Sequence, residues 1–469
     1  MPQRRTKTPQ SKKKKQKKTT TTTTTTVLSS VPALPSFGQY TLKFVNRNLL
    51  KDALNEYQYI SPPKTFCERL CLVRFWNAVA DVYPAWLAPN TVTLCGYVCA
   101  VVVLLLTLVY SPNFPSWYYL VTAFLMFLYQ TADGSDGPQA RRLKCGSALG
   151  ELFDHGVDAV VTSLMYYACT EISGTRITSP FAPIIFSCSA SAFFFSNASL
   201  LHTSRQLFND LDAQELQIGA QLAMVATWWF GPASWATPLP LPRIVAQTIG
   251  ENLPSVAATI DLNVDESTIL FRGALNLAIV CFTIANSINA CQTVRAHYAT
   301  SKKKVMITGR TLEEFWQQVR SMLFLFFLFG LSWYTTASAV QKSSDDAKYA
   351  FRLWFLSCTF AYADLVNHVL VLRVAKIPMP TMIRTRSFWL MSLFAVWTEF
   401  CNRGDTTNPL VQYSDFGRFI VCIACFGSHI YYSTTVGTAI ANGLGVSFFT
   451  VPIAKQKSFL KTKQSKASN

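Results

Sequence analysis

The chain has 469 residues, of which 50% are hydrophobic and only 14% are charged, and its formal net charge is +17. Soluble globular domains carry about 25% charged residues, so this composition excludes an ordinary soluble protein and indicates a polytopic membrane protein. The positive charge is concentrated at the two ends: residues 1–18 hold nine Lys or Arg, and residues 455–466 hold five Lys, with no acid in either segment. Little net charge is left between them, so the composition gives no reason to expect a nucleic-acid partner.

The first segment of the chain, residues 1–35, is predicted to be a disordered basic tail. Its Lys block is followed by an unbroken threonine run from Thr19 to Thr26, and neither can build an apolar core. A second basic tail is expected at residues 451–469, with one membrane domain at residues 36–450 between them. Lys and Arg mark the cytoplasmic side of membrane proteins and attract anionic headgroups. Both tails should therefore be cytosolic, which requires an even number of spans.

Residues 64–82 form the first predicted helix. They place Phe66, Leu70 and Val82 near one helical face, with basic residues between them. This pattern is typical of a helix lying at the membrane surface, and it fits equally well an amphipathic helix that packs on a protein core. The pattern alone does not separate these two interpretations.

Ten apolar segments follow, each long enough to be a candidate span across a hydrocarbon core that needs about 20 residues. They lie near residues 92–110, 116–133, 151–171, 181–201, 216–237, 269–292, 318–340, 351–374, 386–402 and 416–442. The expected fold class is therefore all-α: a polytopic membrane protein with about ten transmembrane helices and an N-terminal interfacial helix. The polar connection near residues 240–268 is expected to be a loop on the side opposite the active site. Asn197 begins an Asn-Ala-Ser glycosylation pattern, which we discount because it lies in an apolar segment.

One strongly polar stretch, DGSDGPQARRLKCGSALGELFDHGVDA, interrupts the apolar segments between Asp133 and Ala159. On a helix, Asp133 and Asp136 are three positions apart and share a face. The following helix carries one polar stripe with helical spacing: Glu151, Asp154, His155 and Asp158. Two carboxylates on one helix would then lie opposite two on the other, with a basic loop between them.

Charged groups inside a membrane are costly, and intramembrane ionisable residues mark functional sites. Four carboxylates repel one another unless a cation joins them, and carboxylate oxygens suit Mg²⁺, Ca²⁺ or Mn²⁺. Two such ions stabilise the attacking and leaving oxygens of phosphoryl chemistry, and Arg141 could then bind phosphate. Gly134, Gly137 and Gly150 would let a polar ligand approach the backbone. The alternative is a set of salt bridges in which Arg141 and Arg142 neutralise the acids, which leaves a net negative charge unexplained.

The spacing of this stretch resembles the full signature of the CDP-alcohol phosphotransferase family. The matching pattern is Asp133-x2-Asp136-Gly137-x2-Ala140-Arg141-x8-Gly150-x3-Asp154-x3-Asp158. The flanking GELFDHG and the upstream LAPNTVT resemble the eukaryotic choline/ethanolamine phosphotransferase branch, although Pro138 stands where that branch is expected to have a basic residue. The resemblance covers most of residues 40–450 and is sharp over about 85–160.

The resemblance implies an enzyme that transfers phosphocholine or phosphoethanolamine from CDP-choline or CDP-ethanolamine to diacylglycerol, or to alkyl-acylglycerol, with release of CMP. It implies two divalent cations, Mg²⁺ or Mn²⁺, bound by Asp133, Asp136, Asp154 and Asp158. Contacts with the CDP-alcohol are implied for Asn90, Arg141, Gly137, Ala140, Gly150 and Glu151. It also implies a homodimer among membrane lipids of the endoplasmic reticulum or the Golgi.

Two side chains compete for the role of general base, His155 and Asp158. A bound cation would lower the basicity of Asp158, whereas an imidazole titrates close to neutral pH. Either Glu151 or Asp158 could orient the ring of His155, and the branch that this chain resembles has the same His as proton acceptor. We therefore predict His155 as the base, with Asp158 as the second candidate.

Three other functions remain open at this stage. Another CDP-alcohol phosphotransferase, for example of the inositol type, would share the same signature. A cation-coupled transporter also places carboxylates in its spans, but it does not need the fixed spacing of Gly, Ala and Arg. An intramembrane prenyltransferase should have a second aspartate-rich motif, and the nearest segment is Asp364–His368, with one acid.

Overall fold

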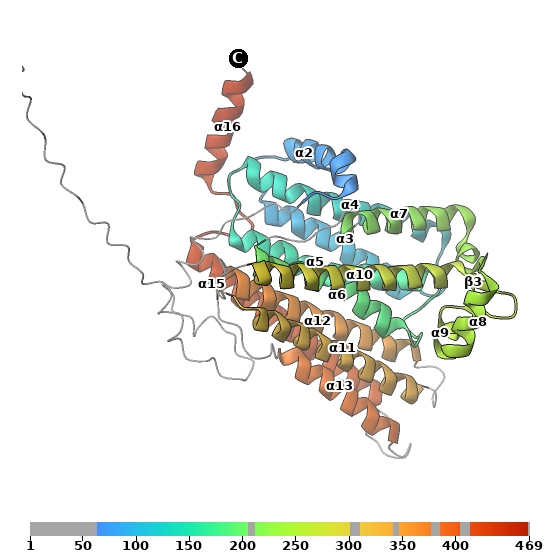
Figure 1. The fold of residues 1–469 in the computed structure, drawn as a ribbon. Coiled ribbons are helices and arrows are strands. Elements are labelled where there is room, and N and C mark those ends of the chain that lie inside the picture. Colours follow the sequence, from blue (N-terminus) through green and yellow to red (C-terminus); the bar gives the residue numbers. More distant parts are fainter. Residues whose placement is uncertain are drawn as a thin grey trace, which may run out of the picture. The chain divides into compact units, whose positions relative to one another are not determined.

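The structure is a computed structural model that describes residues 63–204, 212–300, 310–340, 347–376, 385–403 and 413–467. The predicted tail at residues 1–35 lies outside these ranges, so its disorder stays a prediction. Long helices make up most of the described chain (Figure 1). Helix α2 (Val73–Val82), which continues the short π-helix η3 (Glu68–Leu72), precedes the candidate spans. Helix α16 (Ile453–Ala467) follows them.

A helix covers each of the ten apolar segments identified in the sequence. These helices are α3 (Pro89–Tyr110), α4 (Ser116–Arg142), α5 (Ala148–Ile172), α6 (Ala182–Thr203), α7 (Ala213–Phe230), α10 (Phe271–Thr300), α11 (Leu312–Val340), α12 (Ala347–Val374), α13 (Arg386–Arg403) and α15 (Ser414–Leu444). By length and composition, six helices in the described ranges can cross a membrane: α3, α6, α10, α11, α12 and α15. The described chain is therefore that of an all-α polytopic membrane protein.

Local chemistry explains where several helices begin and end. Pro89 stands in the first turn of α3, where its missing N–H is no loss. Ser147 caps α5, its hydroxyl accepting from the Gly150 N–H at 3.2 Å. A capping box formed by Asp212 and Glu215 opens α7. Gly445, with a φ of 64°, ends α15 in the left-handed conformation that favours glycine.

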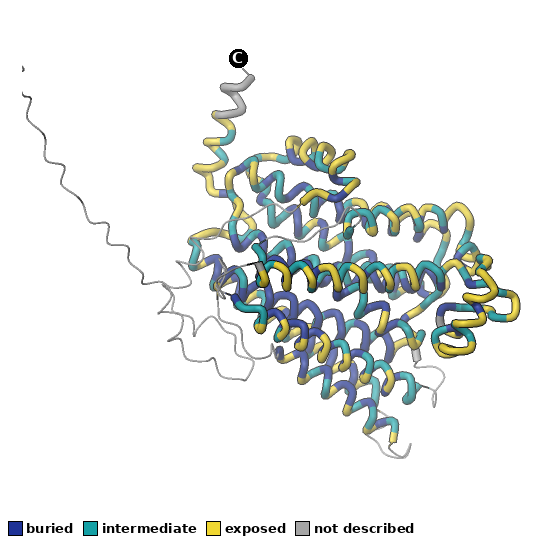
Figure 2. The backbone as a smooth tube through the Cα atoms, in the orientation of Figure 1, coloured by how far each residue is buried: buried dark blue, intermediate teal, exposed yellow. Residues whose placement is uncertain are grey.

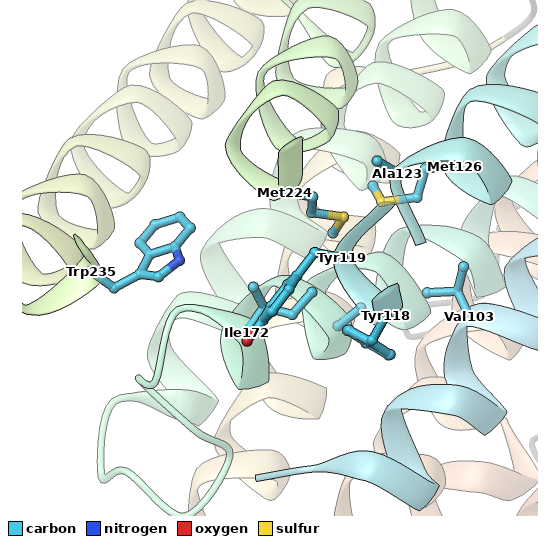
Figure 3. Packing of buried hydrophobic residues seen from close by; sticks show 9 residues of the cluster. Val103, Tyr118, Tyr119, Ala123, Met126, Ile172, Met224 and Trp235 are labelled. Atoms are coloured by element: carbon cyan, nitrogen blue, oxygen red, sulfur yellow. The ribbon is translucent and has the colours of Figure 1, made fainter. Parts of the chain in front are cut away.

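The most deeply buried helix is α12, which packs against α5, α6, α11, α13 and α15. In its most apolar window 89% of the residues are buried, against 11% for α10, and Figure 2 shows the same contrast along the two helices. A second buried cluster joins α3, α4, α5 and α7. Figure 3 shows Tyr118 and Tyr119 of this cluster between Val103, Ile172 and Met224. The helices that carry the polar stretch are thus fixed by apolar packing on both sides.

Helix α2 packs on α4 through Trp76, whose indole lies against Gly134. The face that the sequence identifies as apolar points away from this contact, since Phe66, Leu70 and Val82 are 52%, 63% and 83% exposed. A helix packed into a protein core would bury that face. Of the two interpretations left open by the sequence, the structure therefore disfavours the core helix.

The connection between α7 and α10 is ordered, so the loop predicted near residues 240–268 needs correction. It contains the 3₁₀-helix η4 (Pro232–Ala236), strands β1 (Pro238–Pro240), β2 (Leu262–Asn263) and β3 (Thr268–Leu270), and helices α8 (Arg243–Asn252) and α9 (Pro254–Thr259). The strands form a small antiparallel sheet in the order β1-β3-β2. An ion pair between Arg272 and Asp261, at 2.8 Å, fixes the start of β2 to the start of α10. The polar composition suggested a loop because such short strands and helices produce no long apolar period.

This connection lies at the end of the bundle opposite the start of α5. Thr175, just after the end of α5, accepts a 2.8 Å hydrogen bond from Asn276, near the start of α10. The connection therefore meets the C-terminal end of α5, whereas the polar stretch lies at its N-terminal end, as the sequence predicts.

Candidate active site

Three of the four predicted metal-binding aspartates converge. One carboxylate oxygen from each of Asp133, Asp154 and Asp158 lies within 4.8 Å of the other two. Asp133 belongs to α4 and the other two to α5, and the link between these helices is only five residues long, 143–147. Helix α3 packs on both α4 and α5 and so holds the two carboxylate-bearing faces in place.

The converged carboxylates fit a divalent cation. The Oδ1 atom of Asp154 is buried and has no hydrogen-bond partner among the described residues, although a buried polar atom normally has one. Asp158 accepts a hydrogen bond from the Tyr129 hydroxyl at 2.7 Å. Three carboxylates so close together repel one another, and oxygen donors of this kind are the ligands of Mg²⁺, Mn²⁺ and Ca²⁺.

The salt-bridge alternative does not fit the positions of the two arginines. Arg142 donates to the carbonyl oxygens of Ala80, at 2.6 Å, and Tyr83, at 2.8 Å, so it braces α2 against α4. Arg141 is exposed. Within the described ranges neither guanidinium forms an ion pair with any of the four aspartates. The negative charge of the cluster is therefore not neutralised by the basic loop.

Asp136, the fourth predicted ligand, lies outside the group of three. It is buried one helical turn after Asp133, and its carboxylate accepts a short hydrogen bond from the Thr93 hydroxyl on α3. The sequence indicates no role for Thr93. The structure assigns it one, because a buried carboxylate is stabilised by a donor of this kind.

The three glycines of the polar stretch have different surroundings. A Cβ at Gly134 would lie 2.1 Å from the Trp76 ring, so Gly134 allows α2 to pack and does not face a ligand, contrary to the prediction. A Cβ at Gly137 would lie 3.3 Å from Nη1 of Arg141, which places this guanidinium beside the site. A Cβ at Gly150 would meet nothing closer than the Asn90 Oδ1 at 3.6 Å.

Asn90 and Gly150 bring the N-terminal ends of α3 and α5 together. Asn90 lies in the first turn of α3 and Gly150 in the first turn of α5. Helix N-termini present free N–H groups and a partial positive charge, which attract phosphate. Nearby, Ala140 closes the turn after α4 by accepting from the Cys145 N–H at 3.0 Å. Five residues predicted to contact the CDP-alcohol thus lie around one junction: Asn90, Gly137, Ala140, Arg141 and Gly150.

The ring of His155 is held by a residue that the sequence does not identify. Its Nδ1 atom is 3.0 Å from Oδ1 of Asn197 on α6. The prediction that Glu151 or Asp158 orients the ring is therefore wrong in this structure. The Asn-Ala-Ser pattern was the one signal at Asn197, and the residue is only 1% exposed, which agrees with discounting it as a glycosylation acceptor.

Glu151, predicted to contact substrate, forms a buried ion pair with Arg373 near the end of α12. Sequence reasoning did not find Arg373, because it lies in the last turn of an apolar helix more than 200 positions away. The pair links the first turn of α5 to the most deeply buried helix of the bundle.

The segment after α15 contacts the link between α4 and α5, although the sequence suggests a simple basic tail from residue 451. The Phe153 ring meets those of Phe448 and Phe449, with centroids 6.2 Å and 5.7 Å away. Val451 packs with Ala88 and Leu143. Lys455 donates a hydrogen bond to the Lys144 carbonyl at 2.8 Å. The ring centroid of Phe459 lies 4.5 Å from the Arg142 guanidinium. We call residues 448–459 the C-terminal strap.

Truncation after Thr450 is expected to raise the KM for the soluble substrate about tenfold. Burial of a side chain such as Val451 is worth about 1.5 kcal/mol, and about 1.4 kcal/mol corresponds to a tenfold change in affinity. The loop at residues 143–147 would lose this support. Steady-state kinetics measures the change, and truncation after Lys461, which keeps the strap, is the matched control. Equal KM values for the two truncations would contradict a role for residues 451–459 of the strap.

The segment Asp364–His368 does not provide a second metal site. Asp364 is buried and accepts hydrogen bonds from Ser387 and from His429 Nδ1, the latter at 3.0 Å. His368 stacks on Tyr432, with ring centroids 4.0 Å apart. These contacts join α12, α13 and α15, and no second carboxylate lies in this cluster in the described part of the chain. The expected feature of a prenyltransferase is thus missing from these residues.

The fold and the site together define the class: a helical membrane protein with a carboxylate cluster at a junction of helices. Comparison with known proteins shows which family has a similar sequence. The profile of the CDP-alcohol phosphatidyltransferase family matches residues 86–247, which contain the whole cluster. This part of the chain, residues 86–247, is therefore similar to the CDP-alcohol phosphatidyltransferase family.

Three relatives illustrate the similarity. Cholinephosphotransferase 1 of Saccharomyces cerevisiae is 29% identical over 394 residues, which cover 81% of this chain and 93% of the relative. Cholinephosphotransferase 1 of Xenopus laevis is 32% identical over 202 residues, 42% of this chain and 50% of the relative. Choline/ethanolaminephosphotransferase 2 of Arabidopsis thaliana is 39% identical over 128 residues, 26% of this chain and 33% of the relative. The chain thus spans half or less of two relatives and nearly all of the third.

Proposed function

We propose that this protein is a choline/ethanolamine phosphotransferase. It transfers phosphocholine or phosphoethanolamine from CDP-choline or CDP-ethanolamine to diacylglycerol or alkyl-acylglycerol, and it releases CMP. The observation that carries the proposal is the convergence of Asp133, Asp154 and Asp158 beside the N-termini of α3 and α5, inside the segment that the family profile matches. The names of the three relatives support the choice of substrates.

The carboxylates would hold two divalent cations, Mg²⁺ or Mn²⁺. Asp133, Asp154 and Asp158 are already together, and Asp136, one turn from Asp133 on the same face of α4, is proposed as the fourth ligand. Bound cations neutralise this cluster and stabilise the negative charge that develops on the CMP leaving group.

The CDP-alcohol is proposed to lie at the junction of α3, α4 and α5. The partial positive charge at the N-terminal ends of α3 and α5 attracts its phosphates, and Arg141, beside Gly137, adds a guanidinium that can bind two phosphate oxygens. Asn90 lies beside Gly150, where the backbone is open. Arg142 is committed to α2, so Arg141 is the residue of the pair that is available to substrate.

The transfer itself is a single displacement. The acceptor hydroxyl oxygen bonds to the β-phosphorus, the bond from that phosphorus to the bridging oxygen breaks, and CMP leaves with the electron pair. His155 takes the proton of the hydroxyl, which is a poor nucleophile without a base. Placing these groups in one geometry supplies much of the remaining rate enhancement.

The proposed topology has ten spans, α3 to α7, α10 to α13 and α15, with both termini in the cytosol. Basic residues dominate both ends of the chain, and the α4–α5 loop that contacts the strap would lie on the same side. The exposed Phe66, Leu70 and Val82 support a position of η3 and α2 at the membrane surface. A homodimer in the endoplasmic reticulum or Golgi membrane, and a tail–domain–tail division at residues 35 and 450, complete the proposal.

The purified full chain, supplied with diacylglycerol and Mg²⁺ or Mn²⁺, is expected to release CMP from CDP-choline or CDP-ethanolamine and to form the matching phospholipid. Omission of diacylglycerol should stop CMP release, and excess chelator should stop both. Comparing the two donors and the two cations decides headgroup and metal preference. Full activity in excess chelator would show that the metal-dependent function is wrong.

A further inference from the structure

Within the described ranges, the ring of His155 forms a hydrogen bond to one residue outside its own helix, Asn197. His155 is 8% exposed and Asn197 is 1% exposed, so their 3.0 Å contact between Nδ1 and Oδ1 is shielded from water. His155 belongs to α5 and Asn197 to α6, and these two helices pack against each other. A hydrogen bond in such surroundings is stronger than one at the surface.

The orientation of the Asn197 amide follows from its second partner. Its Nδ2 atom donates to the backbone carbonyl of Phe193, one turn earlier in α6, at 2.9 Å. A carbonyl oxygen only accepts hydrogen bonds, so the amide nitrogen must face Phe193 and the amide oxygen must face His155.

The tautomer of His155 follows in turn. An amide oxygen is an acceptor, so the Nδ1 atom of the ring must carry the hydrogen and donate it. In the neutral ring the lone pair is then on Nε2, which makes no hydrogen bond to any residue in the described ranges. The nitrogen that can accept a proton is thus the one left open.

The two acids that the sequence suggests for this task are occupied elsewhere. Glu151 pairs with Arg373, and Asp158 accepts from the hydroxyl of Tyr129. Asn197 is therefore the partner that can decide the state of the ring.

We propose that Asn197 is a positioning residue that holds His155 in the Nδ1–H tautomer and aims Nε2 at the acceptor hydroxyl. The inference rests on the proposed function and deepens it, because it assigns the proton-accepting atom and the residue that selects it. A ring in the other tautomer would present an N–H to the hydroxyl and could not take its proton.

Two substitutions at Asn197 distinguish the effect of its hydrogen-bond acceptor from the effect of its size and shape. Asn197→Leu has nearly the same size but no acceptor, and its kcat should fall about 10²-fold, within the range for loss of a general base. Asn197→Asp keeps an oxygen for Nδ1 and should retain at least about a tenth of the kcat. In both variants the KM for CDP-choline and the protection by Mn²⁺ against thermal unfolding should stay within about threefold of the wild type.

A double-mutant cycle tests whether Asn197 acts through His155. In a His155→Ala background, Asn197→Leu should have no further effect on the residual rate, because the residue it positions is gone. Ser191→Ala is the matched control, since Ser191 is a buried polar residue of the same helix that contacts Ser287 of α10 instead. This control should change kcat less than about threefold.

Each outcome decides the proposal. Three results would overturn the role of Asn197 while leaving the enzyme function intact. They are an equal loss of kcat in Asn197→Leu and Asn197→Asp, a wild-type kcat in Asn197→Leu, and a full further loss of rate when Asn197→Leu is added to His155→Ala. A wild-type protein that transfers nothing would overturn the proposed function and this inference with it. A selective loss of kcat in Asn197→Leu, absent in the His155→Ala background, establishes the role.

Discussion

Alanine at Asp133, Asp154 or Asp158 is expected to lower kcat by at least about 10³-fold while the protein stays folded. The three carboxylates share one cluster, and loss of one oxygen donor removes charge stabilisation that acts directly on the leaving group. Each substitution removes one of the three mutually repelling carboxylates, so without metal the variants should be as stable as the wild type or more stable. Thermal unfolding in chelator and in Mn²⁺ measures this directly.

A ligand that binds only the folded protein stabilises it by about 2.7 kcal/mol at a hundred times its dissociation constant. The wild type should show such an effect with Mn²⁺, and the three variants should lose it. Asp261→Ala is the matched control, because Asp261 pairs with Arg272 at the far end of the bundle. Retention of Mn²⁺ stabilisation by an inactive Asp154→Ala protein would contradict the assignment of this residue as a ligand.

Asp136→Ala tests the fourth position separately. If both activity and Mn²⁺ stabilisation are lost, Asp136 is a ligand. If the stabilisation survives, its role is limited to the hydrogen bond with Thr93, and Thr93→Val should then reproduce the loss of activity.

Replacing His155 by Ala or Gln is expected to lower kcat by about 10²- to 10⁴-fold with little change in the affinity for metal or CDP-alcohol. General-base catalysis contributes a factor of this size, and the binding groups at the α3–α5 junction stay in place. Turnover, Mn²⁺ stabilisation and equilibrium binding of CDP-choline provide the three measurements.

His202→Gln controls for the loss of a buried histidine in general. His202 is buried at the end of α6, and its ring bonds to the hydroxyl of Tyr298 on α10 at 2.7 Å. It should keep kcat within about threefold. If His155→Ala retains turnover, or loses only metal binding, the role of base passes to Asp158.

Local patterns in the sequence were enough to predict the long helices and the stretch that carries the carboxylate cluster. The hydropathy of each apolar segment is a property of about 20 consecutive residues, so all ten segments could be found without knowing how they pack. The convergence of Asp133, Asp154 and Asp158 was predictable for the same reason, because helical spacing and a five-residue link decide which faces meet. The predicted loop near residues 240–268 was wrong where such periodic signals are short.

By itself, then, the sequence determined the helical membrane class, the position of the polar stretch and the carboxylates that gather there. Only the tertiary structure decided which residues hold that site. Asn197 is 42 positions from His155, and Lys455 is 311 positions from the Lys144 carbonyl that it contacts. The pairing of Arg373 with Glu151 and the packing of Trp76 on Gly134 also join separate helices. Such contacts depend on how whole helices pack, and side-chain periodicity reports only which face of a helix is buried, not the residue that it meets.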